Sequence, residues 1–342
     1  MSERYVFWFE ELGKDHHERV GKKCANLGEI AKIGLPVPPG FALSVEAYKK
    51  FMVSTNAIQE IRNTIQKWSG DITSIEHFNQ ASKEIRQIVE SKEIPLKMKE
   101  IILSYYEDLC RRCGHPDVAV STRSAGPVSH PGQYETYLNV KGKQDLLEKI
   151  VKVWASSFNP RSLAFRSRKG MPIESDPIGV AVLKMVKARA AGVVFTADPN
   201  TGDTSRMIIE ANWGLGESVV SGELMPDVCI LNKESLEIHE KKIGVKLKQV
   251  TFKEVGVTEE ETPADKRSVF CLNDGEMSEI GRLAKILERH FGVPQDVEWA
   301  VDQDSVSPNN IVLLQARPAV IAQKKAPVDQ VVDLMVNLFS KG

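Results

Sequence analysis

Apolar and polar residues alternate along two segments near the C-terminal end of the chain, residues 292–302 and 311–318. A period of two predicts β-strands. The Ser, Pro and Asn residues between the two segments predict a turn, so the pair is interpreted as an antiparallel hairpin. In such a hairpin Glu298, Gln315 and Arg317 lie on the same side. The pattern therefore predicts two oxygen donors and a guanidinium on one surface.

This combination of groups suits a magnesium-bound polyphosphate. Mg²⁺ prefers oxygen ligands and takes one or two of them from protein while it keeps phosphate and water. A guanidinium presents a forked donor that matches phosphate oxygens. An ordinary edge hairpin with a solvated Glu–Arg pair has the same pattern, so the hairpin alone leaves both interpretations open.

The N-terminal third begins with a short apolar strand at residues 5–9, followed by a helical apolar stripe that Gly34 and Pro36 end. Lys23 lies at or near the start of this helix, where amide donors and the helix dipole favour anions. A lysine at such a position is usually solvated, so its place is compatible with a phosphate ligand and with a plain surface charge.

Three further amphipathic segments, 57–68, 74–90 and 96–112, have helical spacing of apolar residues. They contain no grouping of reactive side chains. We therefore predict a helical layer that supports the fold rather than the chemistry.

A strand from Val118 runs into a loop rich in Gly, Ser and Thr, which leads into a second strand ending at Val140. Backbone N–H groups and hydroxyls of such a loop can bind phosphate oxygens, and Arg123 lies at its mouth. The same composition is typical of any strand connection. Residues 143–158 and 161–169 are predicted helices.

The second half of the chain has mainly strand patterns. The predicted strands are 178–186, 191–196, 207–211, 227–232, 235–240 and 246–252. They are followed by a predicted acidic loop at 258–265 and by a helix at about 275–291, which leads into the hairpin.

Bulk properties exclude several classes of protein. The 342 residues carry 45 basic and 46 acidic side chains, a net charge of −1, which gives no basic field for nucleic acid. No apolar run has the length of a membrane span, and the N-terminus does not resemble a signal peptide. The five cysteines include Cys110 and Cys113, half of a zinc-site spacing with no second pair. We expect a cytoplasmic protein with reduced thiols.

Several blocks together resemble the ATP-binding domain of the phosphoenolpyruvate synthase and pyruvate phosphate dikinase family. The resemblance covers roughly residues 20–318, in the family's order. The blocks are Gly21-Lys-Lys-Cys-Ala-Asn-Leu-Gly28, Ser121-Thr-Arg-Ser124, Gly132-Gln-Tyr-Glu-Thr-Tyr-Leu-Asn139, the segments 192–202 and 210–223, and the final hairpin.

The resemblance implies an α+β chain with an ATP-grasp fold, in which ATP lies between two lobes and the N-terminal lobe has a helical layer. It implies ATP and Mg²⁺ as cofactors. The nucleotide-binding residues implied are Lys23, Arg123, Gly132, Thr136, Lys184, Val186 and Arg317. Of these, Lys23, Arg123 and Arg317 are the implied catalytic residues. The implied Mg²⁺ ligands are Glu298 and Gln315.

Two departures concern the nucleotide. The family usually has Gln where this chain has Leu183, so an adenine contact is lost or is made by backbone along 184–187. The segment 125–131 is shorter than the family's run after its Arg-Ser-Ser, which implies a different closure of the phosphate loop.

A third departure concerns the histidine that the family phosphorylates in a Thr-Ser-His type setting. None of the seven histidines here has that setting. The resemblance therefore implies either an excised domain, as of a phosphoenolpyruvate synthase or a rifampin phosphotransferase, or a partner subunit that bears the phosphohistidine and the acceptor site. Split enzymes of the phenylphosphate synthase type, with phenol as acceptor, have an ATP-binding subunit similar in size and content. A non-catalytic nucleotide-sensing subunit is the remaining alternative.

We predict three parts of the chain: an N-terminal lobe with the helical insertion at 1–180, a C-terminal lobe at 181–320, and a linker with an amphipathic helix at 321–342. Apolar residues from Val328 to Phe339 recur at helical spacing in this tail. Such a stripe packs on its own domain or docks on a partner.

Overall fold

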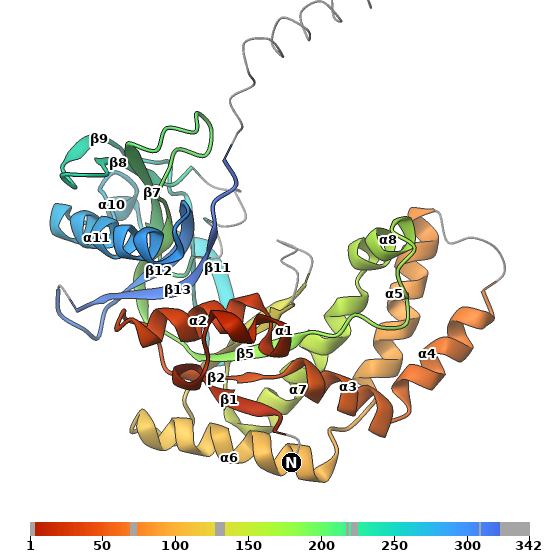
Figure 1. Ribbon diagram of the computed structural model, residues 1–342. Coiled ribbons are helices and arrows are strands. Elements are labelled where there is room, and N and C mark those ends of the chain that lie inside the picture. The colour runs from red at the N-terminus through yellow and green to blue at the C-terminus, as the bar shows by residue number, and fades with distance from the viewer. Residues whose placement is uncertain are drawn as a thin grey trace, which may run out of the picture.

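The computed structural model describes residues 4–68, 74–126, 134–216, 219, 225–307 and 309–321. These residues form a mixed α+β structure with two antiparallel sheets of five and six strands and a separate two-stranded ribbon. Figure 1 shows the two sheets in two neighbouring parts of the molecule, with the C-terminal hairpin and α2 between them. The predicted tail helix at 328–339 and its linker lie outside the described residues.

The first sheet has the order β1-β2-β5-β3-β4, and every neighbouring pair is antiparallel. Its strands are β1 (Val6–Trp8), β2 (Gly40–Leu43), β3 (Val120–Ala125), β4 (Thr136–Val140) and β5 (Gly179–Lys184). β5 spans the predicted boundary at residue 180 and lies wholly in this sheet. The division of the chain into domains stays a prediction.

A helical layer packs on one face of the first sheet. It consists of α3 (Val45–Ser54), α4 (Ala57–Gln66), α5 (Ile75–Glu90), α6 (Leu96–Arg112), α7 (Gly142–Ala155) and α8 (Pro160–Arg168), with the 3₁₀ turn η3 (Ser156–Phe158). Buried residues such as Val182, Trp154 and Tyr106 form one core between this layer and the sheet. The predicted helical layer is therefore present.

The opposite face of the first sheet packs against the N-terminal helices. These are α1 (His17–Val20) and α2 (Lys22–Lys32), which follow the 3₁₀ turns η1 (Phe9–Glu11) and η2 (Lys14–His16). Ala181 and Leu183 of β5 pack there against Cys24 and Leu27. Arg123 alternates with buried residues of β3 and lies on this same face, directly opposite Ala181.

The second sheet has the order β13-β12-β6-β7-β8-β9 and is also antiparallel throughout. Its strands are β6 (Ala188–Phe195), β7 (Arg206–Trp213), β8 (Asp227–Asn232), β9 (Ile238–Lys242), β12 (Gln295–Asp302) and β13 (Ile311–Pro318). One face is covered by α11 (Asp274–Phe291), whose apolar side packs on the alternating residues Val297, Trp299 and Val301. The predicted hairpin is confirmed.

The predicted acidic loop at 258–265 is wrong. Residues Val257–Glu261 form β11, which pairs with β10 (Lys248–Phe252), and Ala264–Arg267 form the short helix α10. Three consecutive glutamates have low strand propensity, but the pairing compensates them. Gln249 donates a hydrogen bond of 2.9 Å to Glu260, and Lys248 forms an ion pair of 2.5 Å with Glu259.

The start of α2 is held close to the end of β3. Gly21, at φ +81°, precedes the helix, and the N–H of Lys22 donates to the carbonyl of Gly126 at 3.0 Å. A Cβ placed on Gly21 would lie 2.0 Å from the carbonyl oxygen of Ala125. Glycine is therefore required here both for its positive φ and for this close approach. The contact sets Lys23 beside the strand that carries Arg123.

Replacing Gly21 by alanine is expected to destabilise the fold by about 3 kcal/mol, since positive-φ strain and backbone overpacking add. Gly34→Ala is a matched control, because Gly34 has φ +78° with no atom near its Cβ position. This control is expected to cost about 1 kcal/mol from strain alone. Denaturant unfolding of both variants measures the difference, and equal losses would show that the close approach at Gly21 is unimportant.

Candidate functional site

Charged side chains from opposite ends of the chain meet between the two sheets. Arg123 of β3 donates from Nη2 to Oε2 of Glu298 on β12 at 2.6 Å, and the two side chains are only 15% and 14% exposed. The same guanidinium reaches the carbonyl of Leu314 on β13 at 3.4 Å. Lys23 of α2 lies close enough to Arg123, Glu298 and Arg317 to interact with each electrostatically. The structure thus brings these four predicted residues together.

Gln315 lies directly opposite Glu298 in the hairpin register, so both side chains are on the face that looks toward Arg123. Two polar atoms in this cluster are buried without a hydrogen-bond partner in the described part of the chain: Oε1 of Gln315 and Nε of Arg123. Buried polar atoms are normally satisfied, and an exception calls for an explanation such as a ligand.

Arg317 is held by a carboxylate that we did not single out from the sequence. Its Nε donates to Oδ2 of Asp296 at 2.7 Å, and its Nη2 lies 2.6 Å from the same oxygen. Asp296 is directly opposite Arg317 in the hairpin. The alternating pattern did put Asp296 on the face of Glu298, and this was the only signal in the sequence.

Burial and neighbouring charges shift the pKa values of the cluster. Burial, with the Arg123 charge nearby, lowers the pKa of Lys23 to about 8. Burial alone would raise the pKa of Glu298, but the Arg123 guanidinium, with Lys23 and Arg317, holds that pKa below its ordinary value. Burial raises the pKa of Asp296 in spite of its ion pair with Arg317. The cluster therefore combines a stable carboxylate with an ammonium that titrates near neutral pH.

Other predicted residues lie at different distances from this cluster. Thr136 is the direct partner of Arg123 in the pairing of β3 with β4, so its side chain shares the Arg123 face. Val186 lies in the connection between β5 and β6, which joins the two sheets. The Lys184 side chain points to the other face of its sheet, toward Cys113, and does not join the cluster. Gly132 lies outside the described residues.

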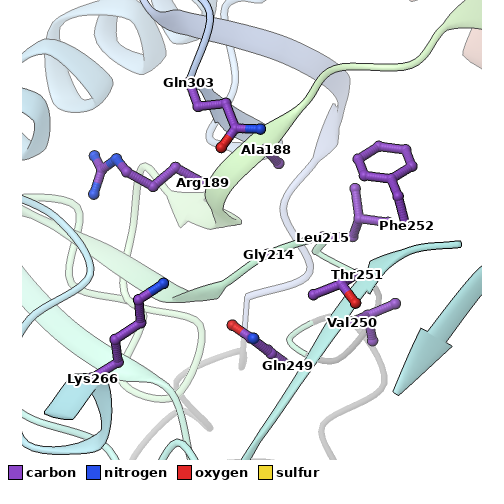
Figure 2. A pocket seen from close by; sticks show the side chains of 10 residues that line it. All are labelled: Ala188, Arg189, Gly214, Leu215, Gln249, Val250, Thr251, Phe252, Lys266 and Gln303. Atoms are coloured by element: carbon purple, nitrogen blue, oxygen red, sulfur yellow. The ribbon is translucent and has the colours of Figure 1, made fainter. Parts of the chain in front are cut away.

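A cavity of about 210 Å³ opens beside the connection between β5 and β6. Figure 2 shows Ala188 and Gln303 on one side of it, Leu215 and Phe252 on another, and Lys266 directed toward it. The N–H of Gln303 donates to the carbonyl of Lys187, which ties the cavity wall to this connection. The cavity contains none of the charged cluster residues.

The family model of the pyruvate phosphate dikinase AMP/ATP-binding domain matches residues 17–337. The chain belongs to this family. The match includes every element from α2 to β13 and thus both sheets, the cluster between them and the connection at Val186. The family assignment confirms the resemblance at the level of an AMP/ATP-binding domain.

Curated relatives of this AMP/ATP-binding domain bear the name phosphoenolpyruvate synthase. A probable phosphoenolpyruvate synthase of Methanocaldococcus jannaschii is 36% identical over 331 residues, which are 94% of this chain and 27% of the relative. One of Methanothermobacter thermautotrophicus is 36% identical over 92% of this chain and 46% of its own length. The phosphoenolpyruvate synthase of Aeropyrum pernix is 35% identical, covering 95% and 43%. The chain therefore spans less than half the length of these relatives.

The donor set of this AMP/ATP-binding domain fits Mg²⁺. The described residues contain no group of three or more His, Cys, Asp or Glu side chains arranged for a metal. Mg²⁺ bound with a nucleotide needs only one or two protein oxygens, because phosphate and water supply the rest. Glu298 and the unpartnered Oε1 of Gln315 supply such a pair. Within the described residues, no helix combines the length and the apolar character that crossing a membrane requires.

Proposed function

We propose that the two sheets form an ATP-grasp site that binds ATP between them. The carrying observation is the ion pair of Arg123 with Glu298, which joins β3 of one sheet to β12 of the other with Lys23 and Arg317 beside it. Three cations around one carboxylate leave an excess of positive charge, which suits a polyphosphate. In this proposal Lys23, Arg123 and Thr136 hold phosphates from the first lobe.

From the second lobe, Glu298 and Gln315 hold Mg²⁺, and Arg317 binds the phosphoryl group that is transferred. Bound Mg²⁺ supplies charge neutralisation to the phosphates. The Arg123–Glu298 pair supports this arrangement, because each partner is already desolvated and each is matched to one part of a metal-bound phosphate. The unpartnered Oε1 of Gln315 and Nε of Arg123 give the ligand two further contacts.

The adenine end is proposed to lie at the connection between β5 and β6, where backbone groups replace a side-chain contact. Within the described residues the N–H of Val186 has no acceptor, whereas the N–H groups of Lys184, Met185 and Ala188 are all paired. Leu183 is only 2% exposed and packs in the core, so it offers the base no polar group. The cavity beside Ala188 adds space at this end.

The proposed reaction transfers the terminal pyrophosphoryl group of ATP to a histidine on a partner subunit, with release of AMP. Loss of phosphate then leaves a phosphohistidine, which passes its phosphoryl group to a final acceptor. Phosphoryl transfer asks mainly for positioning and for neutralisation of charge. The cluster of Lys23, Arg123 and Arg317 supplies both. As the specific case we propose the ATP-binding subunit of a phenylphosphate synthase, with phenol as acceptor.

The test is incubation of the chain with ATP, Mg²⁺ and candidate histidine-bearing partner proteins. AMP is expected to appear only with a partner, together with an acid-labile phosphate on that partner. ATP binding without AMP formation, in the presence of every partner that forms a stable complex, would favour a nucleotide-sensing subunit. Mass spectrometry of the native complex identifies the partner and shows whether the chain acts as a subunit or as a domain of a longer enzyme.

The pKa of Lys23 predicts a specific pH dependence of ATP binding. Phosphates favour the ammonium form, so ATP raises a pKa that lies at about 8 in the free protein. Below that pH, Lys23 is protonated in both states and affinity is constant. Above it, binding takes up a proton, and affinity falls by up to about tenfold per pH unit. Calorimetry in buffers of different ionisation enthalpy measures this uptake.

Lys23→Arg is the matched control for this prediction. Its guanidinium stays charged across the range, so the affinity of the variant is expected to be flat between pH 7 and pH 9. The same decline in wild type and in the variant would assign the titration to another group.

A further inference from the structure

The helical layer contacts the strand that carries Thr136 through ionic groups as well as through its apolar core. On β4 the side chains alternate, so Thr136 faces Arg123 while Glu135 and Tyr137 face the helices. Arg86 of α5 binds the Glu135 carboxylate with both terminal nitrogens, Nη1 to Oε1 at 2.5 Å and Nη2 to Oε2 at 3.0 Å. The Tyr137 hydroxyl donates to the same carboxylate.

A second ionic contact holds the preceding residue. The Tyr134 hydroxyl donates to Oδ2 of Asp176 at 2.7 Å, and the same oxygen receives Nη1 of Arg166 at 2.7 Å. Arg166, on α8, is only 2% exposed and also donates to the carbonyl of Ser157. Figure 1 shows α5 and α8 side by side at the far end of the helical layer. Residues 134, 135 and 137 are therefore each fixed to this layer.

These contacts exceed what the fold needs at this place. β4 is an edge strand, and its sheet pairing involves β3 alone. A bidentate arginine–carboxylate pair fixes both direction and distance, unlike an apolar contact. The residue that it fixes directly precedes Thr136, and Thr136 is opposite the arginine of the charged cluster. Hydrogen bonds from the N–H of Glu135 to Ser156 at 3.1 Å complete the attachment.

We propose that Arg86 and Glu135 are positioning residues for the phosphate-binding face of β4. Arg86 holds Glu135, and Glu135 sets the height of Thr136 beside Arg123. The helical layer is thereby part of the ATP site rather than only its support. This inference rests on the proposed function, because it assumes that Thr136 and Arg123 meet the phosphates of ATP.

The test compares Arg86→Gln, Glu135→Gln and the double variant in calorimetric titrations with ATP and with AMP, each with Mg²⁺. Arg86→Gln is expected to weaken ATP roughly tenfold, since displacement of a binding group by a fraction of an ångström has effects of this order. AMP lacks the two phosphates farthest from the base, so its affinity is expected to stay unchanged. The double variant is expected to be no worse than either single one, because both remove the same contact.

Lys92→Gln is the matched control. Lys92 forms an ion pair of 2.7 Å with Glu60 of α4 in the same helical layer, away from residues 134–137. Its melting temperature is expected to fall about as much as that of Arg86→Gln, with ATP affinity retained. Equal ATP affinities of Arg86→Gln and Lys92→Gln, or a parallel loss of AMP, would overturn the positioning role. Failure of the wild-type chain to bind ATP would instead refute the proposed function.

Discussion

Replacing Arg317 by methionine is expected to lower AMP formation about a thousandfold while ATP affinity changes less than about threefold. Arg317 is held in place by Asp296 through two nitrogens, so its guanidinium is pre-organised rather than recruited by the ligand. A pre-organised cation acts most strongly where charge develops in the transition state. Single-turnover AMP formation with the histidine-bearing partner measures the rate, and calorimetry with ATP measures the affinity.

Two further variants sharpen this test. Asp296→Asn leaves the guanidinium present but weakens its support, so an intermediate loss of rate is expected, about tenfold to a hundredfold. Arg189→Met is the matched control. Arg189 also pairs with a carboxylate of the second lobe, Glu276 at 2.6 Å, but lies away from the cluster. A loss of ATP affinity as large as the loss of rate in Arg317→Met would contradict a role confined to the transition state.

Replacing Glu298 by glutamine is expected to have opposite effects on metal-bound and metal-free ATP. The variant keeps the shape of the side chain but loses a carboxylate whose pKa is held low by Arg123. The Mg²⁺ concentration needed for half-maximal AMP formation is expected to rise at least about tenfold, because a neutral amide is a weaker ligand for a hard cation. Metal-free ATP is expected to bind more tightly, because Arg123 and Lys23 are released from their anionic neighbour.

Titration of Mg²⁺ in the activity assay, and of ATP in the presence of a chelator, measures the two effects. Asp302→Asn is the control, since Asp302 is an acidic residue at the far end of the same strand, where it accepts from the N–H of Asp304. Unchanged Mg²⁺ dependence in Glu298→Gln would remove this residue from the metal site. Weaker binding of metal-free ATP would show that Glu298 does not compete with the phosphates for Arg123.

The parts of the site that the sequence predicted depend on local regularities. Strand alternation has a period of two whatever the tertiary fold, so Glu298, Gln315 and Arg317 were placed on one face correctly. Lys23 and Arg123 were found through motifs whose glycines and hydroxyl residues mark turns and helix starts. That they meet is a tertiary fact, and only the order of the blocks along the chain indicated it.

The parts that were missed depend on long-range geometry. The opposition of Asp296 to Arg317 requires a register shift between Glu298 and Trp299, and no residue type marks that irregularity. β11 was missed because its glutamates favour a loop until the residues of β10 pair with them. Arg86 precedes its partner Glu135 by 49 residues and lies in an ordinary amphipathic helix. Nothing in its own neighbourhood distinguishes it from a surface arginine.

The ion pair between Arg123 and Glu298 couples the histories of two distant positions. Loss of either charge leaves the other desolvated and uncompensated between the sheets, even before any ligand arrives. A substitution at residue 123 therefore places selection on residue 298, although 174 others separate them in the chain. Homologous chains in which one of the two has changed are expected to have changed the other as well.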